Sequence, residues 1–130
     1  MIRGLGTDMV EIARIEQALA RRGERFARRI LGPEEYAAFV ASGWRACHLA
    51  KRFAAKEAAS KALGTGIGRV SWHDIEVLND PQGAPYLRFH RNAAARMAEL
   101  GASTAWLSLS DEGGLALAFA LVEGGLEPSS

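Results

Sequence analysis

Apolar positions in the first half of the chain recur at helical spacing. Ile12, Ile15 and Leu19 fall on one face of a helix. Gly23 interrupts that helix, and Pro33 followed by two glutamates is typical of a new helix start. The pattern predicts helices over residues 11–22, 24–31, 33–41, 49–63 and 92–100.

Apolar and polar residues alternate in much of the second half. Residues 74–79 and 85–90 alternate in this way, and residues 80–84 between them form a strong turn signal. Further strands are predicted over residues 2–10, 104–110 and 115–122. The order of strand, helices, hairpin, helix and hairpin indicates an α+β fold, in which an antiparallel sheet packs against helices, and not a doubly wound sheet.

The composition is that of one globular domain. The 130 residues are 48% hydrophobic and 24% charged, which excludes disorder over most of the chain. No segment approaches the roughly 18–20 apolar residues of a membrane span, and the N-terminus lacks a secretory signal pattern. Cys47 is the single cysteine, which excludes an internal disulfide and favours a reducing compartment. We expect a cytoplasmic protein with one domain over residues 1–123 and a flexible tail over residues 124–130.

The net charge of +1 conceals an asymmetry between the two halves of the chain. Residues 1–65 carry a net charge of +5 and residues 66–130 a net charge of −4. If residues 11–29 formed one continuous helix, six arginines would lie within about 120° of arc, opposite its apolar face. Such a cluster is either a solvated face or a docking surface for an acidic partner. The six are Arg14, Arg21, Arg22, Arg25, Arg28 and Arg29.

A stripe of side chains along the longest predicted helix can carry chemistry. Phe53, Glu57 and Lys61 are spaced four residues apart and lead into the Gly64-Thr65-Gly66 loop. A carboxylate, a lysine and a loop that exposes backbone N–H groups can together hold a divalent metal and a phosphate. The structural alternative is a stabilising Glu57–Lys61 helix pair followed by a glycine that ends the helix.

Asp8 also has two interpretations. It can cap the first helix, because Glu11 three residues later fits a capping box. It can instead pair with Glu57 and offer two oxygen ligands to Mg²⁺ shared with substrate phosphates.

A nucleic-acid-binding module is the alternative from another functional class, with the arginine cluster as its contact surface. Aromatic stacking partners are not interleaved with those arginines, and the second half of the chain is acidic. The alternative also leaves Asp8 and Glu57 without a role.

The chain resembles the holo-[acyl carrier protein] synthase family, the small bacterial 4′-phosphopantetheinyl transferases. The resemblance covers almost the whole chain and rests on paired motifs at a fixed separation. These are GLGTD at 4–8, RIE at 14–16, RFAAKEA at 52–58, KA at 61–62, GTG at 64–66, LGPEE at 31–35, DIEV at 74–77 and LSLSDE at 107–112.

The resemblance implies an activity, a cofactor and an assembly. The family transfers 4′-phosphopantetheine from coenzyme A to a serine of apo acyl carrier protein, for fatty acid biosynthesis, and releases adenosine 3′,5′-bisphosphate. It uses Mg²⁺ and forms homotrimers with active sites at the subunit interfaces. No nucleic acid and no membrane is expected among the partners.

The resemblance also assigns roles to residues. Asp8 and Glu57 fall on the metal-ligand positions, and with Lys61 they form the expected catalytic set. The expected contacts to coenzyme A are Arg52, Lys61, Gly64, Thr65 and Gly66. Acyl carrier proteins are strongly acidic, and the expected docking residues are Arg14, Arg21, Arg25, Phe26 and Arg28.

Two roles stay open at this point. Some family members have a histidine where this chain has Asp111, and there it helps to bind the nucleotide end of coenzyme A. An aspartate cannot stabilise a phosphate in that way, so Arg45, Lys51 or a neighbouring subunit would have to compensate. The base that accepts the serine proton is either Glu57 or a water beside the metal.

Overall fold

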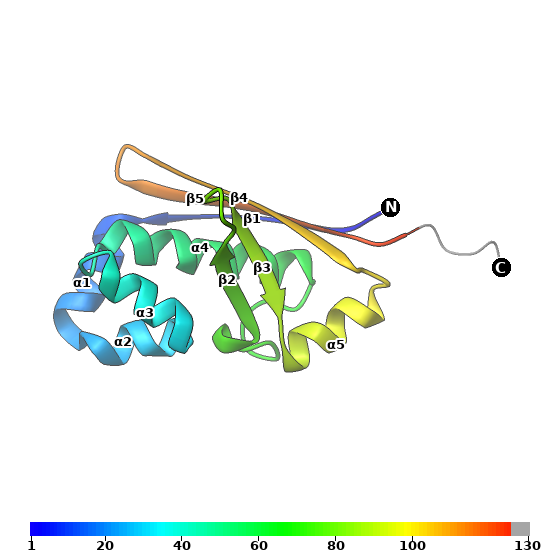
Figure 1. Ribbon diagram of the computed structural model, residues 1–130, viewed down its shortest axis with the longest axis horizontal. Helices are drawn as coiled ribbons and strands as arrows, with labels where there is room; N and C mark the ends of the chain where they lie inside the picture. Colours follow the sequence, from blue (N-terminus) through cyan, green and yellow to red (C-terminus); the bar gives the residue numbers. More distant parts are fainter. Residues whose placement is uncertain (126–130) are drawn as a thin grey trace.

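The structure is a computed structural model that describes residues 1–125, in which the helices gather on one side of a long sheet (Figure 1). The helices are α1 (Ile12–Arg22), α2 (Glu24–Ile30), α3 (Pro33–Ala41), α4 (Ala46–Ala62), α5 (Arg91–Glu99) and a short 3₁₀ helix, η1 (Trp72–Asp74). The strands are β1 (Ile2–Glu11), β2 (Ile75–Asn79), β3 (Pro85–Phe89), β4 (Thr104–Glu112) and β5 (Leu115–Glu123). The predicted α+β architecture with antiparallel sheets is confirmed.

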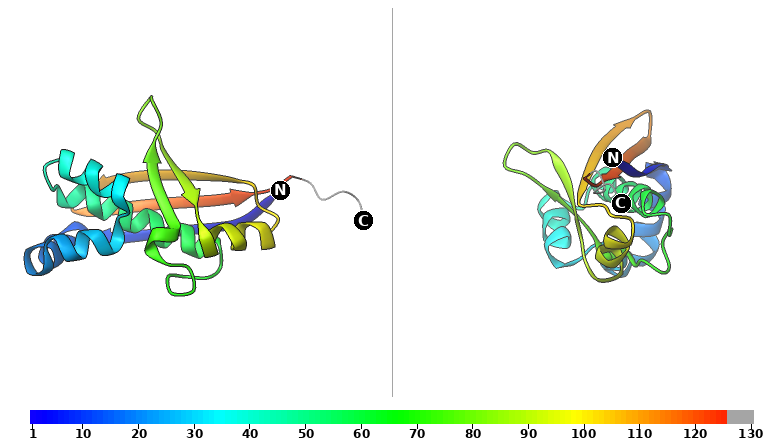
Figure 2. Two further views of the ribbon diagram at one scale, coloured as in Figure 1. Left: turned by 60° about the horizontal axis from the view of Figure 1, so that its bottom comes forward. Right: turned by 90° about the vertical axis from the view of Figure 1, so that its right-hand side faces the viewer.

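The long sheet has the strand order β1-β5-β4, and β2 and β3 form a separate hairpin. All pairs are antiparallel, and Asp8 on β1 lies opposite Ala118 on β5. Figure 2 shows the β2–β3 hairpin projecting beyond the rest of the molecule. The inner face of the long sheet packs on α4, which places β1 and α4 side by side.

Small residues allow α4 to lie directly on the sheet. A Cβ atom on Gly6 would lie 1.9 Å from the carbonyl oxygen of Ala58, and one on Gly4 would lie 1.9 Å from that of Ala62. Residues with side chains are therefore excluded at both glycines. The facing surfaces of α4 and β5 are buried alanines: Ala54, Ala55, Ala58, Ala59, Ala62, Ala116, Ala118 and Ala120.

The outer face of the long sheet is apolar and exposed. Phe119 lies at its centre, between Thr7 on β1 and Ser108 on β4. In the part of the chain that the structure describes, no helix covers this face (Figure 1). The exposed large apolar residues on it are Leu5, Met9, Trp106, Leu117 and Phe119. An uncovered apolar surface of this kind marks an interaction site.

Three local expectations are corrected by the structure. Strand β1 continues to Glu11, which is itself the N-cap of α1, so the interpretation of Asp8 as a helix cap is wrong. The chain breaks at Gly23, whose φ is 53°, so the arginines belong to two helices and the continuous-helix register does not apply. Helix α4 begins at Ala46, three residues before its predicted start.

Residues 1 and 124 continue the pairing of β1 with β5 beyond the ends of the two strands. The Met1 amino group donates to the carbonyl oxygen of Gly124 at 2.7 Å, and the Gly124 N–H donates back to Met1. Residues 126–130 of the expected tail lie outside the described residues. No helix within residues 1–125 is long and apolar enough to cross a membrane.

Candidate active site

Asp8 lies on the inner face of β1, beside α4, and pairs with a lysine of that helix. The Lys61 ammonium lies 3.2 Å from Asp8 Oδ1 and donates to the Thr7 carbonyl oxygen at 2.9 Å. Among the described residues, the ion pair of Lys61 is therefore with β1 and not with its helix neighbour Glu57. The alternative of a Glu57–Lys61 helix pair is retained only as a weaker electrostatic interaction, since the Lys61 charge still acts on the pKa of Glu57.

Glu57 faces the same position from α4. Burial and the negative charge of Asp8 raise the pKa of Glu57, and the positive charge of Lys61 partly offsets this. Burial is the larger cause, and the contribution of Asp8 places its carboxylate close enough to that of Glu57 for the two negative charges to repel each other. A cation between them would relieve that repulsion.

This pair of carboxylates fits Mg²⁺ better than a metal with an all-protein cage. In residues 1–125 no three His, Cys, Asp or Glu side chains are grouped so that they could hold a metal ion. Two carboxylates leave most of an octahedral shell to water and phosphate oxygens, which is the usual arrangement for Mg²⁺ beside a phosphorylated substrate.

The three charged groups line a groove of about 410 Å³. Arg14, Phe26 and Phe53 line it as well, so α1, α2 and α4 all contribute to its walls. A second hollow, of about 660 Å³, opens on the outer face of the sheet and is lined by Asp8, Met9, Lys61 and Phe119 among others. Asp8 and Lys61 line both hollows and thus lie where the groove meets the exposed sheet face, whereas Glu57 lines the groove alone.

The loop after α4 differs from its expected role. Gly64 has a φ of 74° and directly follows the C-cap residue of α4, as the helix-ending interpretation predicts. The N–H groups of Thr65 and Gly66 both donate to the Ser60 carbonyl oxygen at 3.1 Å. The expectation that these N–H groups are exposed for a ligand is therefore wrong.

Arg52 does not line the groove in this structure. It is buried, and its guanidinium donates to the side-chain oxygen of Asn79 at the end of β2. Burial lowers the pKa of Arg52, and the charge of Glu35 partly offsets that effect. Its contact with coenzyme A stays a prediction.

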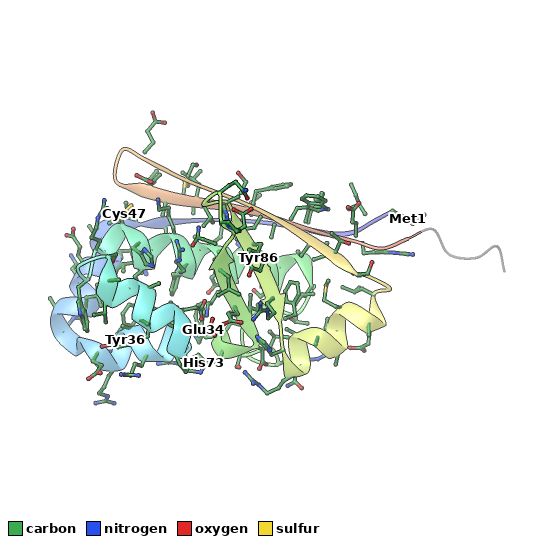
Figure 3. The ribbon with its side chains drawn as sticks, viewed as in Figure 1. Met1, Glu34, Tyr36, Cys47, His73 and Tyr86 are labelled. Atoms are coloured by element: carbon green, nitrogen blue, oxygen red, sulfur yellow. The ribbon has the colours of Figure 1, made fainter. Side chains whose placement is uncertain are left out.

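The structure brings only some of the expected docking residues together, and Arg25 is exposed on α2. Arg14 and Phe26 line the groove, and Arg14, Arg21 and Arg22 surround a shallow hollow of about 220 Å³ on α1. Arg28 is already engaged, since it pairs with Glu24 at 2.9 Å and lies 4.0 Å above the ring of Tyr36. Figure 3 labels Tyr36, which lies on α3 and donates its hydroxyl to Glu24 as well.

Asp111 has a partner that the sequence did not reveal. It lies 3.1 Å from the Lys51 ammonium, and this contact lowers the pKa of Asp111. The aspartate therefore neutralises one of the two cations that were candidates to compensate for the missing histidine.

Two buried polar residues, Lys56 and Glu35, were not predicted from the sequence, although a lysine among buried alanines is a visible signal.

Comparisons with known proteins agree with this geometry. The model of the 4′-phosphopantetheinyl transferase superfamily matches residues 4–120. A holo-[acyl-carrier-protein] synthase from Halorhodospira halophila is 56% identical over 123 residues, which cover 94% of this chain and 98% of the relative.

Two solved structures are similar over nearly their whole length. The holo-[acyl-carrier-protein] synthase from Neisseria meningitidis has a TM-score of 0.87 and 44% identity, covering 95% of this chain and 99% of its own. The corresponding enzyme from Helicobacter pylori, in complex with coenzyme A, has a TM-score of 0.81 and 33% identity, covering 92% and 99%.

Proposed function

The chain belongs to the 4′-phosphopantetheinyl transferase superfamily, and from this we propose that it transfers 4′-phosphopantetheine from coenzyme A to a serine of apo acyl carrier protein. The products are holo acyl carrier protein, for fatty acid biosynthesis, and adenosine 3′,5′-bisphosphate. The observation that carries the proposal is the groove in which Asp8, Glu57 and Lys61 meet Arg14 and Phe26. Coenzyme A as substrate and the single free thiol Cys47 fit a cytoplasmic location.

Asp8, Glu57 and Lys61 have complementary roles in this reaction. Asp8 and Glu57 would hold Mg²⁺, which when bound neutralises negative charge on the pyrophosphate oxygens. Lys61, fixed by Asp8 and the Thr7 carbonyl, adds a positive charge where that negative charge develops. Thr65 and Arg52 are further candidate contacts to the coenzyme A phosphates.

The transfer is a displacement at the phosphorus next to pantetheine. The serine oxygen forms the new P–O bond, the bond to the adenosine 3′,5′-bisphosphate oxygen breaks, and the serine proton leaves. Glu57 and a water in the groove are the two candidate acceptors of that proton. The raised pKa of Glu57 belongs to the metal-free groove, and bound Mg²⁺ would lower it, so this pKa does not favour either acceptor.

Intact-mass spectrometry tests the function directly. The chain is incubated with coenzyme A, Mg²⁺ and apo acyl carrier protein, and the carrier protein should gain the mass of one phosphopantetheine group. A carrier protein whose acceptor serine is replaced by alanine serves as the control. An unchanged mass of the unmodified carrier protein would refute the proposed function.

The docking surface predicts an effect on the carrier protein alone. Reversing Arg14 and Arg21 to glutamate should raise the KM for acyl carrier protein about tenfold or more, because an acidic partner then meets like charge. The Kd for coenzyme A should stay unchanged, and added salt should weaken the wild-type interaction. Arg69→Glu, on the exposed loop before η1, is the matched control. An unchanged KM in the double variant would place docking elsewhere.

We also propose a homotrimer whose active sites lie at the subunit interfaces. The exposed apolar sheet face supports it, as does the hollow that joins this face to Asp8 and Lys61. Sedimentation velocity should show a trimer for the wild type. Phe119→Glu should dissociate it and lower activity, whereas Val40→Glu should not, although Val40 on α3 is equally exposed, at 44% against 43%. A fully active wild-type monomer would contradict this assembly.

A further inference from the structure

A buried ion pair joins Lys56, the residue before Glu57 on α4, to Glu35 on α3, and none of the chemistry above uses it. The side chain of Lys56 is 0% exposed and that of Glu35 is 2% exposed, and their charged groups lie 2.8 Å apart. The Lys56 ammonium also donates to the Ile30 carbonyl oxygen at 2.6 Å and to the Trp72 carbonyl oxygen at 3.0 Å. All three of its donors are therefore used.

Glu35 ties further segments to the same point. Its Oε1 accepts the Gly32 N–H and its Oε2 accepts the Val77 N–H, each at 2.9 Å. The pair therefore connects α4 to the end of α2, the start of α3, η1 and β2. Figure 3 shows this side of the molecule, where His73 of η1 lies close to the start of α3.

Stability alone does not account for such a pair. Well-packed apolar side chains of similar volume are often as stabilising as a buried ion pair, because removing both charges from water costs about as much as their attraction returns. An ion pair differs from an apolar contact in being directional, since each hydrogen bond fixes an angle as well as a distance.

The hydrogen bonds of the Lys56–Glu35 pair fix the rotation of α4 about its own axis. Successive helix residues are about 100° apart, so Lys56 and Ala58 point to nearly opposite sides of α4 and Glu57 points between them. Ala58 is held by the close approach of Gly6 on the sheet side. Lys56 is fixed by its hydrogen bonds on the other side, so contacts on both sides of Glu57 hold α4 in place.

A second connection reaches the wall of the groove. The Trp72 backbone accepts a hydrogen bond from Lys56, and the Trp72 ring packs against Phe53 with 4.9 Å between the ring centroids. Phe53 lines the groove one turn before Glu57. The same lysine therefore supports both the carboxylate and the aromatic wall beside it.

We propose that Lys56 and Glu35 form a positioning pair for the transfer reaction, which holds the rotation of α4 so that Glu57 and Phe53 face Asp8 across the groove. The proposal rests on the proposed function and adds two residues that touch neither substrate. Substituting either residue of the pair should therefore lower turnover even under conditions in which the variant is fully folded.

The test uses two substitutions in the pair and one in the core nearby. Lys56→Met removes the charge of the side chain and keeps most of its volume. Glu35→Gln keeps the size of the side chain, but its amide NH₂ group replaces one of the two oxygens that accept hydrogen bonds from backbone N–H groups. Both should lower kcat about 10- to 100-fold at a temperature where the variant is fully folded by circular dichroism. The KM values for coenzyme A and for carrier protein should stay within about threefold of wild type.

Phe39→Leu is the matched control, since Phe39 is fully buried one turn after Glu35 on α3 and has no polar atom in its side chain. It should lower the Tm and leave kcat unchanged. Wild-type kcat in both folded pair variants, or failure of both to fold, would overturn the positioning role. An inactive wild type would instead refute the proposed function, so the two failures are distinguishable.

Discussion

Glu57→Gln is expected to lower kcat by about 100- to 1,000-fold while leaving the fold intact. Glutamine has the size of glutamate but carries no charge, so Asp8 would be the one carboxylate left to hold Mg²⁺ among the described residues that line the groove. It is also a poor proton acceptor, so either candidate role of Glu57 is lost. The measurement is the time course of holo acyl carrier protein by intact mass, with Glu99→Gln on α5 as an exposed carboxylate control.

The stability of the same variant gives an independent check. Burial and Asp8 raise the pKa of Glu57, so without Mg²⁺ the ionised form costs stability once the pH exceeds the pKa of the unfolded chain. The neutral glutamine removes this cost. At neutral pH the Tm of Glu57→Gln should equal or exceed that of wild type, and the difference should shrink as the pH falls below the ordinary glutamate pKa. A lower Tm at neutral pH would mean that Glu57 is a structural residue.

Mg²⁺ with coenzyme A should raise the Tm of wild type, because a ligand that binds the folded state stabilises it by mass action. The shift should be much smaller in Glu57→Gln. Full activity of Glu57→Gln at ordinary Mg²⁺ concentrations would contradict the assignment of this carboxylate.

The elements of the fold could be predicted because each has a local period. Alternating residues in β2 and β3 and the apolar face of α1 gave the correct element types. The start of α4 was placed three residues late, since Arg45 is an N-cap without a side-chain hydrogen bond and carries no sequence signal for a helix start. The break at Gly23 was visible, but its effect on the arginine register was not.

The role of Asp8 could not be decided locally. The capping-box interpretation considers residues 8–11 alone, whereas pairing of Glu11 with Leu115 extends β1 through them. That pairing joins segments more than 100 residues apart, and it turns Asp8 toward α4. Strand formation by a distant partner therefore overrode a local helix-start motif.

The carboxylates and the lysine of the candidate site were predicted from the sequence, but the contacts that the charged side chains make were not. Whether Lys61 pairs with Glu57 or Asp8 depends on how closely β1 approaches α4. The burial of Arg52 against Asn79 and the pairing of Arg28 with Glu24 and Tyr36 likewise depend on packing between elements. Charge clusters in the sequence do not show which members are already neutralised.

Gly6→Ala is expected to lower the free energy of unfolding by about 3 kcal/mol or more. The added Cβ would lie 1.9 Å from the Ala58 carbonyl oxygen and 2.7 Å from the Ala62 nitrogen. Both are backbone atoms of α4, so no side chain can move aside, and the helix must separate from β1. Since Asp8 is two residues further along β1 and Glu57 adjoins Ala58, activity should fall with stability.

Urea unfolding of Gly6→Ala measures the loss, with Gly125→Ala as the control because no atom lies within 4 Å of the Cβ it would add. A second substitution, Ala58→Gly, tests whether the side chain or the backbone of Ala58 causes the clash. Trimming the Ala58 side chain should not rescue Gly6→Ala, because the obstructing atom is the Ala58 carbonyl oxygen. Rescue by Ala58→Gly, or a loss of less than about 1 kcal/mol in Gly6→Ala alone, would show that β1 and α4 are not held together by this backbone approach.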